Sequence, residues 1–238
     1  MFKRPHHQRI ARVLQALDGP LLLSHGCLFG GGTCIALRYG EYRESVDIDF
    51  IVSDVQGYRA LRSVLTGPQG LVGVTKAGAI PLVQSREIRA DQYGIRTQLL
   101  IDGLALKFEV VLEGRIALDA PSSADAILGI STLTPLDMAT TKLLANSDRQ
   151  ADDGMFSRDV IDLAMMQPKL ALLRAALAKA ETAYGPSVSR DLATAISNLQ
   201  RREGWLERCM QAMLIDMPKA LLWQKVSVLA RVLAAPSK

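Results

Sequence analysis

The 238-residue sequence has few cysteines and no long apolar run, and both absences limit what the protein can be. The three cysteines, Cys27, Cys34 and Cys209, are too few and too irregularly spaced for a disulfide framework, so we expect reduced thiols. No segment approaches the roughly 20 apolar residues of a membrane-spanning helix, and the basic start lacks the apolar stretch of a secretion signal. We therefore expect a cytoplasmic protein with no membrane partner.

Histidine is also scarce, and the usual sequence signs of covalent catalysis are missing. His6 and His7 lie near the N-terminus without a third ligand in view, and His25 is isolated, so we expect surface or satisfied core positions for all three. There is no Gly-x-Ser-x-Gly motif and no Gly-Lys-Ser/Thr ending to a glycine turn. These absences exclude a serine-hydrolase elbow and a Walker-type phosphate loop.

Positive charge gathers toward the C-terminus. From Lys169 onward there are 11 Lys and Arg against 5 Asp and Glu, although the whole chain carries only +4. Clustered cations suit a polyanionic partner such as RNA, and Trp205 and Trp223 offer rings that stack on bases. Two other interpretations stay open. The cations are then simply those of solvated helix faces, and helical spacing favours core or interface positions for both tryptophans.

The pattern of apolar residues predicts an α+β fold, with a mixed β-sheet flanked by helices and then a C-terminal helical bundle. Thr134, Pro135 and Asp137 mark the start of the first bundle helix. We therefore expect two domains, at residues 1–133 and 134–238. Before that boundary the predicted elements are helices at 9–17, 33–40 and 55–65, a strand at 46–52 and a strand meander within 80–113. After it, further helices are predicted at 158–166, 169–184, 189–202, 205–215 and 219–233.

The predicted strand at 46–52 carries two acids on one face. Residues two apart in a strand point the same way about 6.6 Å apart, so Asp47 and Asp49 project together while Ile48 and Phe50 enter the core. A divalent cation would remove the repulsion between the carboxylates, and hard oxygen ligands suit Mg²⁺ better than zinc. The alternative is a strand whose solvated face carries two acids.

A glycine turn lies shortly before this strand. Gly30, Gly31 and Gly32, followed by Thr33, precede a predicted helix, where unpaired N–H groups and the helix dipole favour an anion. Thr33 either caps the helix or offers its hydroxyl to a phosphate. The turn and the acid pair together predict a site for a triphosphate and Mg²⁺.

These motifs resemble the signature of the DNA polymerase beta-like nucleotidyltransferase superfamily, and within it the AbiEii/AbiGii toxin-type family. That family carries a Gly-Gly-Thr turn, a helix ended by glycine and a Ser-x-Asp-Ile-Asp-Phe strand. The likeness covers about residues 29–163. The matching residues here are Gly31, Gly32, Thr33, Gly40, Ser45, Asp47, Ile48, Asp49 and Phe50.

The resemblance implies a third carboxylate on a later strand. In "LALKFEVVLEG", Leu106, Phe108 and Val110 would face the core, leaving Glu109 on the opposite face with Lys107. Glu109 is the expected third acid, although the family more often has Asp and Glu113 shares its parity. The alternative for Glu109 is a surface acid paired with a cross-strand base.

The resemblance also implies basic groups in the helical part. Lys142 would contact the nucleotide phosphates, Arg158 would add a second positive charge, and Ser45 would belong to the nucleotide-binding set. The alternatives are a solvated helix face for Lys142 and an ion pair with Asp162 for Arg158. Asp159 and Asp162 would hold helices together.

The activity implied is metal-dependent transfer of a nucleoside monophosphate from a nucleoside triphosphate. Asp47, Asp49 and Glu109 would form a two-metal Mg²⁺ site, and Gly31, Gly32 and Thr33 would hold the phosphates. The family further implies a toxin with a separately encoded antitoxin, acting on RNA, at the acceptor end of tRNA. Alternatives are transfer to a small molecule, as in antibiotic modification, transfer to a protein, and a member that binds a nucleotide or partner without catalysis.

Overall fold

A computed structural model describes residues 2–234, and the chain forms two units in it. The first comprises Met1–Glu41 and Ser45–Thr134, and the second comprises Tyr42–Glu44 and Pro135–Lys238. The division after Thr134 lies one residue beyond the predicted domain boundary. The short segment Tyr42–Glu44, which we call the strap, belongs to the second unit although its neighbours on both sides belong to the first.

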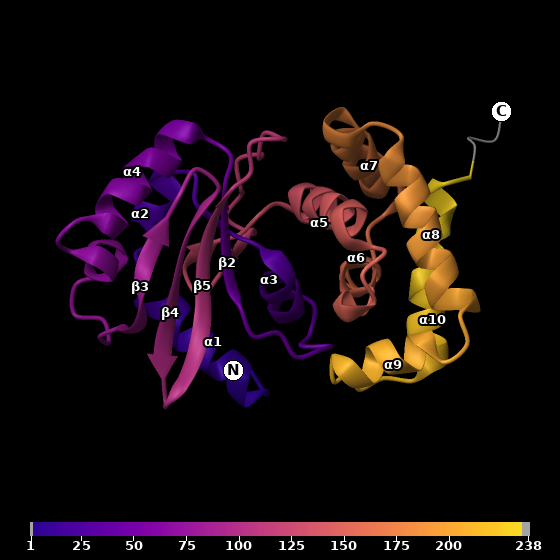
Figure 1. The fold of residues 1–238 in the computed structure, drawn as a ribbon, viewed down its shortest axis with the longest axis horizontal. Helices are drawn as coiled ribbons and strands as arrows, with labels where there is room; N and C mark the ends of the chain where they lie inside the picture. Colours follow the sequence, from indigo (N-terminus) through magenta and orange to yellow (C-terminus); the bar gives the residue numbers. More distant parts are fainter. Residues whose placement is uncertain (1, 235–238) are drawn as a thin grey trace. The chain divides into compact units, whose positions relative to one another are not determined.

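The first unit is built on a five-stranded sheet with the order β1-β2-β5-β4-β3 (Figure 1). Only β2 and β5 run parallel, because β3, β4 and β5 form the predicted meander and β1 pairs antiparallel with β2. The sheet is therefore mixed, as the sequence predicted. Its strands are β1 (Leu28–Phe29), β2 (Ile48–Val52), β3 (Val83–Ala90), β4 (Gly94–Ile101) and β5 (Leu104–Leu112).

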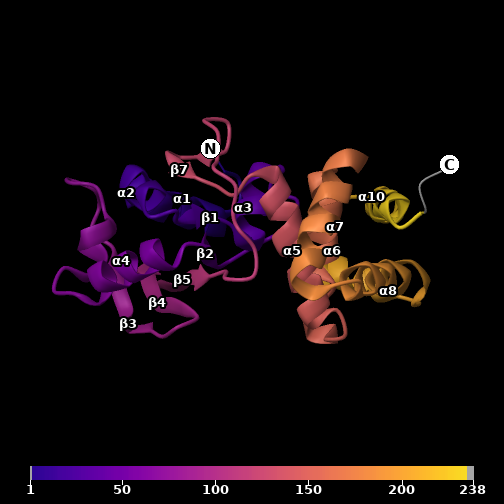
Figure 2. The same cartoon turned by 90° about the horizontal axis from the view of Figure 1, so that it is seen from above.

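Helices of the first unit flank this sheet. Figure 2 shows α1, α2 and α4 on one side of it. Phe50 lies between Phe29 and Phe108 in the core, with ring centroids 5.6 Å apart in both pairs. The remaining elements of the unit are α1 (Pro5–Ala16), α2 (Gly19–Ser24), α3 (Gly31–Arg38), α4 (Val55–Thr66), the 3₁₀ turn η1 (Gly70–Val74) and the hairpin of β6 (Ala126–Ile127) and β7 (Ile130–Ser131).

Strand parity follows the prediction from the sequence. Ile48, Phe50 and Val52 of β2 are buried, whereas the intervening Asp49 and Ile51 are partly exposed. On β5, Leu106, Phe108 and Val110 are buried in the same alternation. The two strands therefore present their polar residues on the sheet face opposite to the aromatic core.

Up to residue 234, the second unit consists of helices joined by turns and linkers, together with the strap. Helix α5 contacts α6, α7 and α8, and α10 contacts α6 and α8, which makes a bundle. No helix within residues 2–234 is both long enough and apolar enough to cross a membrane. The elements are α5 (Pro135–Arg149), η2 (Asp153–Met155), α6 (Arg158–Met166), α7 (Leu170–Tyr184), α8 (Ser187–Arg201), α9 (Trp205–Ala212), α10 (Lys219–Leu229) and η3 (Ala230–Val232).

Some helix starts differ from the predictions. Helix α1 begins at Pro5 and helix α3 at Gly31, before the predicted starts at residues 9 and 33. Helix α2 was not predicted, and Asp18 caps it by accepting the N–H of Leu21 at 3.0 Å. A polar side chain or a glycine is compatible with either end of a helix, and sequence alone does not show which end.

The cysteines agree with the expectation of reduced thiols. Cys27, Cys34 and Cys209 are buried and form no disulfide. Burial raises the pKa of the Cys27 thiol well above its usual range. An uncharged buried thiol is a poor nucleophile, so these residues act as small apolar side chains.

Candidate functional site

The glycine turn forms the first turn of helix α3. Gly30 is the N-cap residue, and Gly31 has φ +68°, a left-handed conformation that favours glycine. The first N–H groups of a helix have no partner within the helix. The N–H groups of Gly31, Gly32 and Thr33 therefore occupy the position at which helices bind anions.

The same turn lies directly against the acid-bearing strand. The Gly30 N–H donates to the Asp49 carbonyl oxygen at 2.9 Å. A Cβ atom at Gly31 would overlap the Asp49 carboxylate, so only glycine fits there without displacing that side chain. The predicted phosphate turn and the second aspartate are thus neighbours in space as well as in sequence.

The predicted third acid lies beside this aspartate. Asp49 and Glu109 are register partners on the parallel strands β2 and β5 and project from the polar face of the sheet. Asp47 is half-buried and comes one residue before β2 begins at Ile48. Glu113 lies beyond the end of β5, and its carboxylate accepts from Arg115 Nη2 at 2.6 Å and Nε at 2.8 Å. The register favours Glu109 over Glu113 as the acid nearest to Asp49.

Two basic side chains bind Glu109. Arg96 Nε on the adjacent strand β4 and Lys107 Nζ each lie 2.5 Å from a carboxylate oxygen of Glu109, which is 8% exposed. This is the cross-strand pairing that the alternative interpretation of Glu109 anticipated. The described residues, 2–234, contain no cluster of three or more His, Cys, Asp or Glu side chains arranged to hold a metal ion. The role of Glu109 as a metal ligand therefore stays a prediction.

The charge at this face nevertheless fits a divalent cation. Burial lowers the pKa of Lys107, but Glu109, Asp49 and Asp47 raise it, and the net pKa lies above the usual value. One ammonium group thus interacts with all three acids that the sequence selected. The carboxylate oxygens that stabilise the Lys107 ammonium are hard donor atoms, the kind of ligand that Mg²⁺ prefers. A bound divalent ion would take over the charge that Lys107 now supplies.

The Thr33 hydroxyl of the turn is hydrogen-bonded to Ser45, which lies between α3 and β2. Thr33 is 1% exposed, and its Oγ1 donates to Ser45 Oγ at 2.8 Å. Ser45 also binds His7, because the Ser45 N–H donates to His7 Nε2 at 3.2 Å. The prediction that His7 is a satisfied core residue is confirmed, and its contact with Ser45 was not foreseen.

The basic residues expected in the helical part lie in the second unit. Lys142 is 5% exposed, and its Nζ lies 3.0 Å from Asp159 Oδ1 and 2.6 Å from Asp162 Oδ2. The alternative of a solvated helix face is wrong for Lys142. Both aspartates bridge helices α5 and α6, as predicted. Whether Lys142 also contacts a nucleotide stays a prediction.

The strap completes this ion-pair network. Arg43 donates to Asp162 through Nε at 2.6 Å and Nη2 at 2.9 Å, and the Tyr42 hydroxyl donates to Asp162 Oδ1 at 2.5 Å. Asp162 is fully buried, and burial raises its pKa, but Arg43 and Lys142 outweigh that effect and lower the pKa overall. The partners that hold Asp162 are the strap and Lys142, so the alternative of an ion pair between Arg158 and Asp162 is not the arrangement found. The role of Arg158 at the nucleotide stays a prediction.

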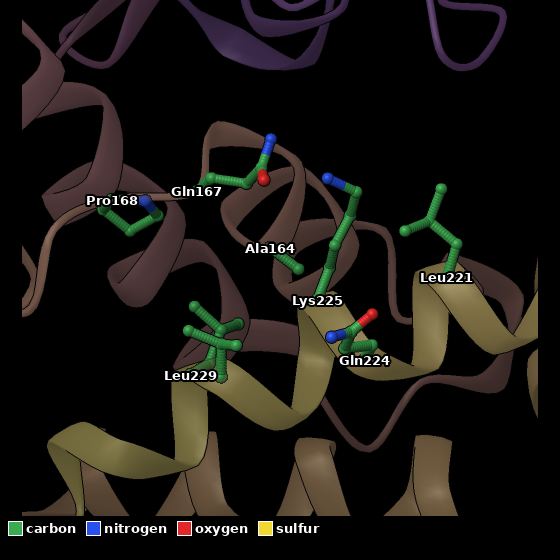
Figure 3. Close-up of a pocket in the computed structure, with 8 residues that line it drawn as sticks. Ala164, Gln167, Pro168, Leu221, Gln224, Lys225 and Leu229 are labelled. Carbon is green, nitrogen blue, oxygen red and sulfur yellow. The ribbon is translucent and has the colours of Figure 1, made fainter.

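The second unit also contains an apolar pocket of about 220 Å³ between α6 and α10. Figure 3 shows the side chains of α10 facing Gln167 and Pro168 across it. Leu221, Val228 and Leu229 of the α10 segment are among its apolar lining residues. No residue expected to act in catalysis lines this pocket, and it is smaller than the usual small-molecule site.

Comparison with known proteins identifies the family. The model of the family described as "Nucleotidyl transferase AbiEii toxin, Type IV TA system" matches residues 12–226. The chain belongs to the AbiEii family. Its members are nucleotidyltransferases, so the enzyme class and the resemblance seen in the sequence are confirmed. Membership also implies a nucleoside triphosphate substrate and an antitoxin partner.

One solved structure supports the fold. JHP933 from Helicobacter pylori matches with 17% identity and a TM-score of 0.51, covering 96% of this chain and 90% of that one. A second H. pylori protein, provisionally described as a nucleotidyltransferase, matches with 17% identity and a TM-score of 0.47, covering 96% of this chain and 92% of that one. A search of curated proteins found no match. At this identity the first likeness shows the fold alone, and it confirms the predicted α+β class.

For this AbiEii member, the two tryptophans have opposite environments. Trp205 is 4% exposed, donates from Nε1 to Ser157 Oγ at 3.0 Å, and lies beneath the guanidinium of Arg202. Its predicted core position is confirmed. Trp223 on α10 is 45% exposed, so it is not a core residue, and an interface position for it stays a prediction. Residues on the exposed face of a helix recur every third or fourth position, just as buried ones do, so spacing alone did not distinguish buried Trp205 from exposed Trp223.

Proposed function

We propose that the protein transfers a nucleoside monophosphate from a nucleoside triphosphate to RNA, at the acceptor end of tRNA, in a Mg²⁺-dependent reaction. The observation that carries the proposal is the contact of Gly31 with Asp49, which is itself in register with Glu109. Phosphate-binding N–H groups and carboxylates that bind a metal are thereby within reach of one substrate.

In the proposed reaction an acceptor hydroxyl oxygen forms a bond to the α-phosphorus and the bond to pyrophosphate breaks. Gly31, Gly32 and Thr33 would bind phosphate oxygens through N–H groups, and Ser45 through its hydroxyl. Asp47 and Asp49 would hold the metals, and Glu109 would complete the site and accept the proton of the attacking hydroxyl. Bound Mg²⁺ would activate that hydroxyl and neutralise the departing pyrophosphate. Lys142 and Arg158 are proposed to add positive charge.

An RNA acceptor is supported by charge. The part of the chain after Lys169 has an excess of Lys and Arg, and Trp223 presents an exposed ring. Backbone phosphates bind clustered cations, and bases stack on exposed aromatic rings. We further propose that residues 1–133 form the catalytic domain and that residues 134–238 contribute to acceptor binding.

The test is to incubate the protein with Mg²⁺ and each α-labelled nucleoside triphosphate, together with total tRNA, aminoglycosides and cell protein. We expect label in tRNA. Label in either of the other fractions would replace the RNA acceptor with a small molecule or a protein. Absence of pyrophosphate release with every acceptor would indicate a binding protein without transfer activity.

The acid residues are tested by substitution. Asp49→Asn should abolish transfer while leaving the thermal transition in place, because the amide keeps the size of the side chain and loses its charge. Glu109→Gln should lower the rate by at least about 100-fold, the usual contribution of a general base. Glu113→Gln is the matched control, since Glu113 is equally buried but pairs with Arg115. Full activity in Asp49→Asn would refute the assignment.

A further inference from the structure

The imidazole ring of His7 lies at the centre of a buried hydrogen-bond chain in the first unit. His7 is in the first turn of α1 and is fully buried. Its Nδ1 lies 2.8 Å from Glu41 Oε1, and its Nε2 lies 3.2 Å from the Ser45 backbone nitrogen. The ring therefore binds both residues that flank the strap, Glu41 before it and Ser45 after it.

The two contacts determine which ring nitrogen carries the proton. A backbone N–H can only donate, so His7 Nε2 must accept from Ser45 and carry no hydrogen. The proton of the neutral ring then lies on Nδ1, where it donates to the Glu41 carboxylate. Such a carboxylate commonly orients a functional histidine in this way.

Glu41 is itself held in place by the start of α1. Its carboxylate accepts the N–H groups of Lys3 at 2.7 Å and Arg4 at 3.2 Å. Burial raises the pKa of Glu41, but these N–H groups and His7 lower it, and the net pKa is below the usual value. Glu41 also has φ +54°, an uncommon conformation for a residue other than glycine. An ionised, well-anchored acceptor thus faces His7.

The other end of the chain reaches the glycine turn. Ser45 Oγ accepts from Thr33 Oγ1, and Thr33 lies in the first turn of α3. With its oxygen already accepting this bond, Ser45 has its own hydroxyl proton available for a ligand oxygen. The buried Thr33 hydroxyl is engaged with Ser45, so Ser45 is the better placed of the two hydroxyls to donate to a phosphate.

We propose that His7 is a positioning residue for the nucleotide site, which holds the Ser45 backbone so that the Ser45 hydroxyl and the Thr33 turn are aligned for phosphate binding. This inference rests on the proposed function of the Gly31–Thr33 turn. His7 contacts neither substrate nor metal in this role. His7 acts through the hydrogen bond that its Nε2 accepts from the Ser45 N–H, so a replacement side chain must place an acceptor atom at the same position.

Two amide variants separate that bond from simple packing. In His7→Gln, the amide oxygen reaches the position of Nε2 and accepts from the Ser45 N–H. In His7→Asn, the shorter side chain places its amide nitrogen near the position of Nδ1, keeping the donor to Glu41 and leaving the Ser45 N–H without its acceptor. Both variants are uncharged and replace the ring, so both lose packing.

The test measures binding of α,β-methylene nucleoside triphosphates with Mg²⁺ by calorimetry. His7→Asn should raise the Kd about tenfold, the loss of roughly one hydrogen bond from a Ser45 hydroxyl that is no longer aligned with the phosphate, and His7→Gln should stay within about twofold of wild type. The melting temperatures of the two variants should fall by similar amounts. Wild-type-like affinity in His7→Asn would overturn the inference, as would equal losses of affinity in both variants.

A second measurement does not depend on nucleotide binding. Imidazole ¹⁵N shifts of the full-length wild-type protein should show the Nδ1–H tautomer of His7, with a scalar coupling across the bond from the Ser45 N–H. A proton on Nε2 would refute the inference whatever the nucleotide affinity. If the tautomer is as expected but wild type binds none of the analogues, the proposed function fails and the coupling between His7 and Ser45 stands.

Discussion

Gly31 shows how one residue joins two parts of the candidate site. Its left-handed φ allows helix α3 to begin abruptly after β1, and its lack of a Cβ lets the Asp49 carboxylate lie against the backbone. The Gly-Gly-Thr turn was identified from the sequence because glycines before a helix favour anions. The contact with Asp49 was not identified, because it depends on how α3 packs on β2.

We predict that Gly31→Ala abolishes nucleotidyl transfer by displacing the Asp49 carboxylate. The matched control is Gly26→Ala, since Gly26 has φ +63° and nothing within 4 Å of the added Cβ. The backbone strain should lower the unfolding free energy of either variant by about 1–2 kcal/mol. Activity and thermal unfolding of both variants check the prediction. A Gly31→Ala variant with the activity of Gly26→Ala would contradict it.

At the scale of elements, the polar face of β2, β5 and β4 balances acids against bases. Asp49 and Glu109 face each other across the parallel pair, and Arg96 and Lys107 flank Glu109. The alternation of β5 predicted that Glu109 would share a face with Lys107. It did not predict Arg96, because the pairing of β4 with β5 is a register that only the folded meander defines.

We predict that Lys107→Met strengthens divalent-metal binding. The Lys107 ammonium, 44% exposed, interacts with the carboxylates that would bind a metal and therefore competes with it. Removing the ammonium should lower the Kd for Mn²⁺ about tenfold. Calorimetric titration measures this directly. Lys76→Met is the control, because Lys76 Nζ donates to the Gln15 carbonyl in the same unit. Unchanged or weaker Mn²⁺ binding in Lys107→Met would show that the two cations do not compete.

Helix α10 carries the exposed ring that suits an RNA acceptor. We predict that Trp223→Ala weakens tRNA binding by roughly tenfold, within the range of about 1–3 kcal/mol for one stacked base. Leu221→Ala is the control, since Leu221 is an exposed apolar residue on the same helix. Filter binding at a fixed salt concentration compares the two variants. Equal tRNA affinities would exclude Trp223 from the acceptor surface.

At the scale of the whole molecule, the two units do not correspond to two uninterrupted stretches of chain. The strap supplies Tyr42 and Arg43 to Asp162, so residues 135–238 by themselves lack two partners of a fully buried carboxylate. Removing one partner of a buried ion pair typically costs about 3–5 kcal/mol. The strap is therefore part of the stability of the second unit, although it lies within the sequence of the first.

The buried network should also control stability in acid. Burial raises the pKa of Asp159, but Lys142 and Arg149 lower it well below the usual range. Because the folded-state pKa is depressed, the stabilisation is present above the unfolded pKa of about 3.9 and is lost as pH falls toward the folded value. We therefore predict that the wild-type melting temperature drops steeply below about pH 4.5.

Asp159→Asn tests this prediction. The variant should be less stable at neutral pH, and its melting temperature should depend less on pH in the acid range, because the titrating group is gone. Asp216→Asn, at an exposed position in the same unit, should keep the wild-type slope. Melting curves from pH 3 to 7 measure all three proteins. Identical slopes in wild type and Asp159→Asn would remove Asp159 from the acid response.

Local pattern was enough to predict most of the helices and strands and to select the candidate residues. Alternation identified the acid strand and the face of Glu109, helical spacing identified most of the bundle, and the glycine turn with the Asp-x-Asp pair indicated the family. These features are encoded by residues close together in the chain. Each can therefore be recognised before anything is known about packing.

Tertiary structure alone decided which distant residues act on one another. His7 and Ser45 are 38 residues apart, and Arg43 and Asp162 are 119 apart. No periodicity connects such pairs, because their contact depends on the path of the chain between them. For the same reason the sequence did not show that Lys142, which the resemblance assigned to the nucleotide phosphates, is a buried partner of two aspartates. Burial and pairing are properties of the fold, since they arise only when separate elements exclude water together.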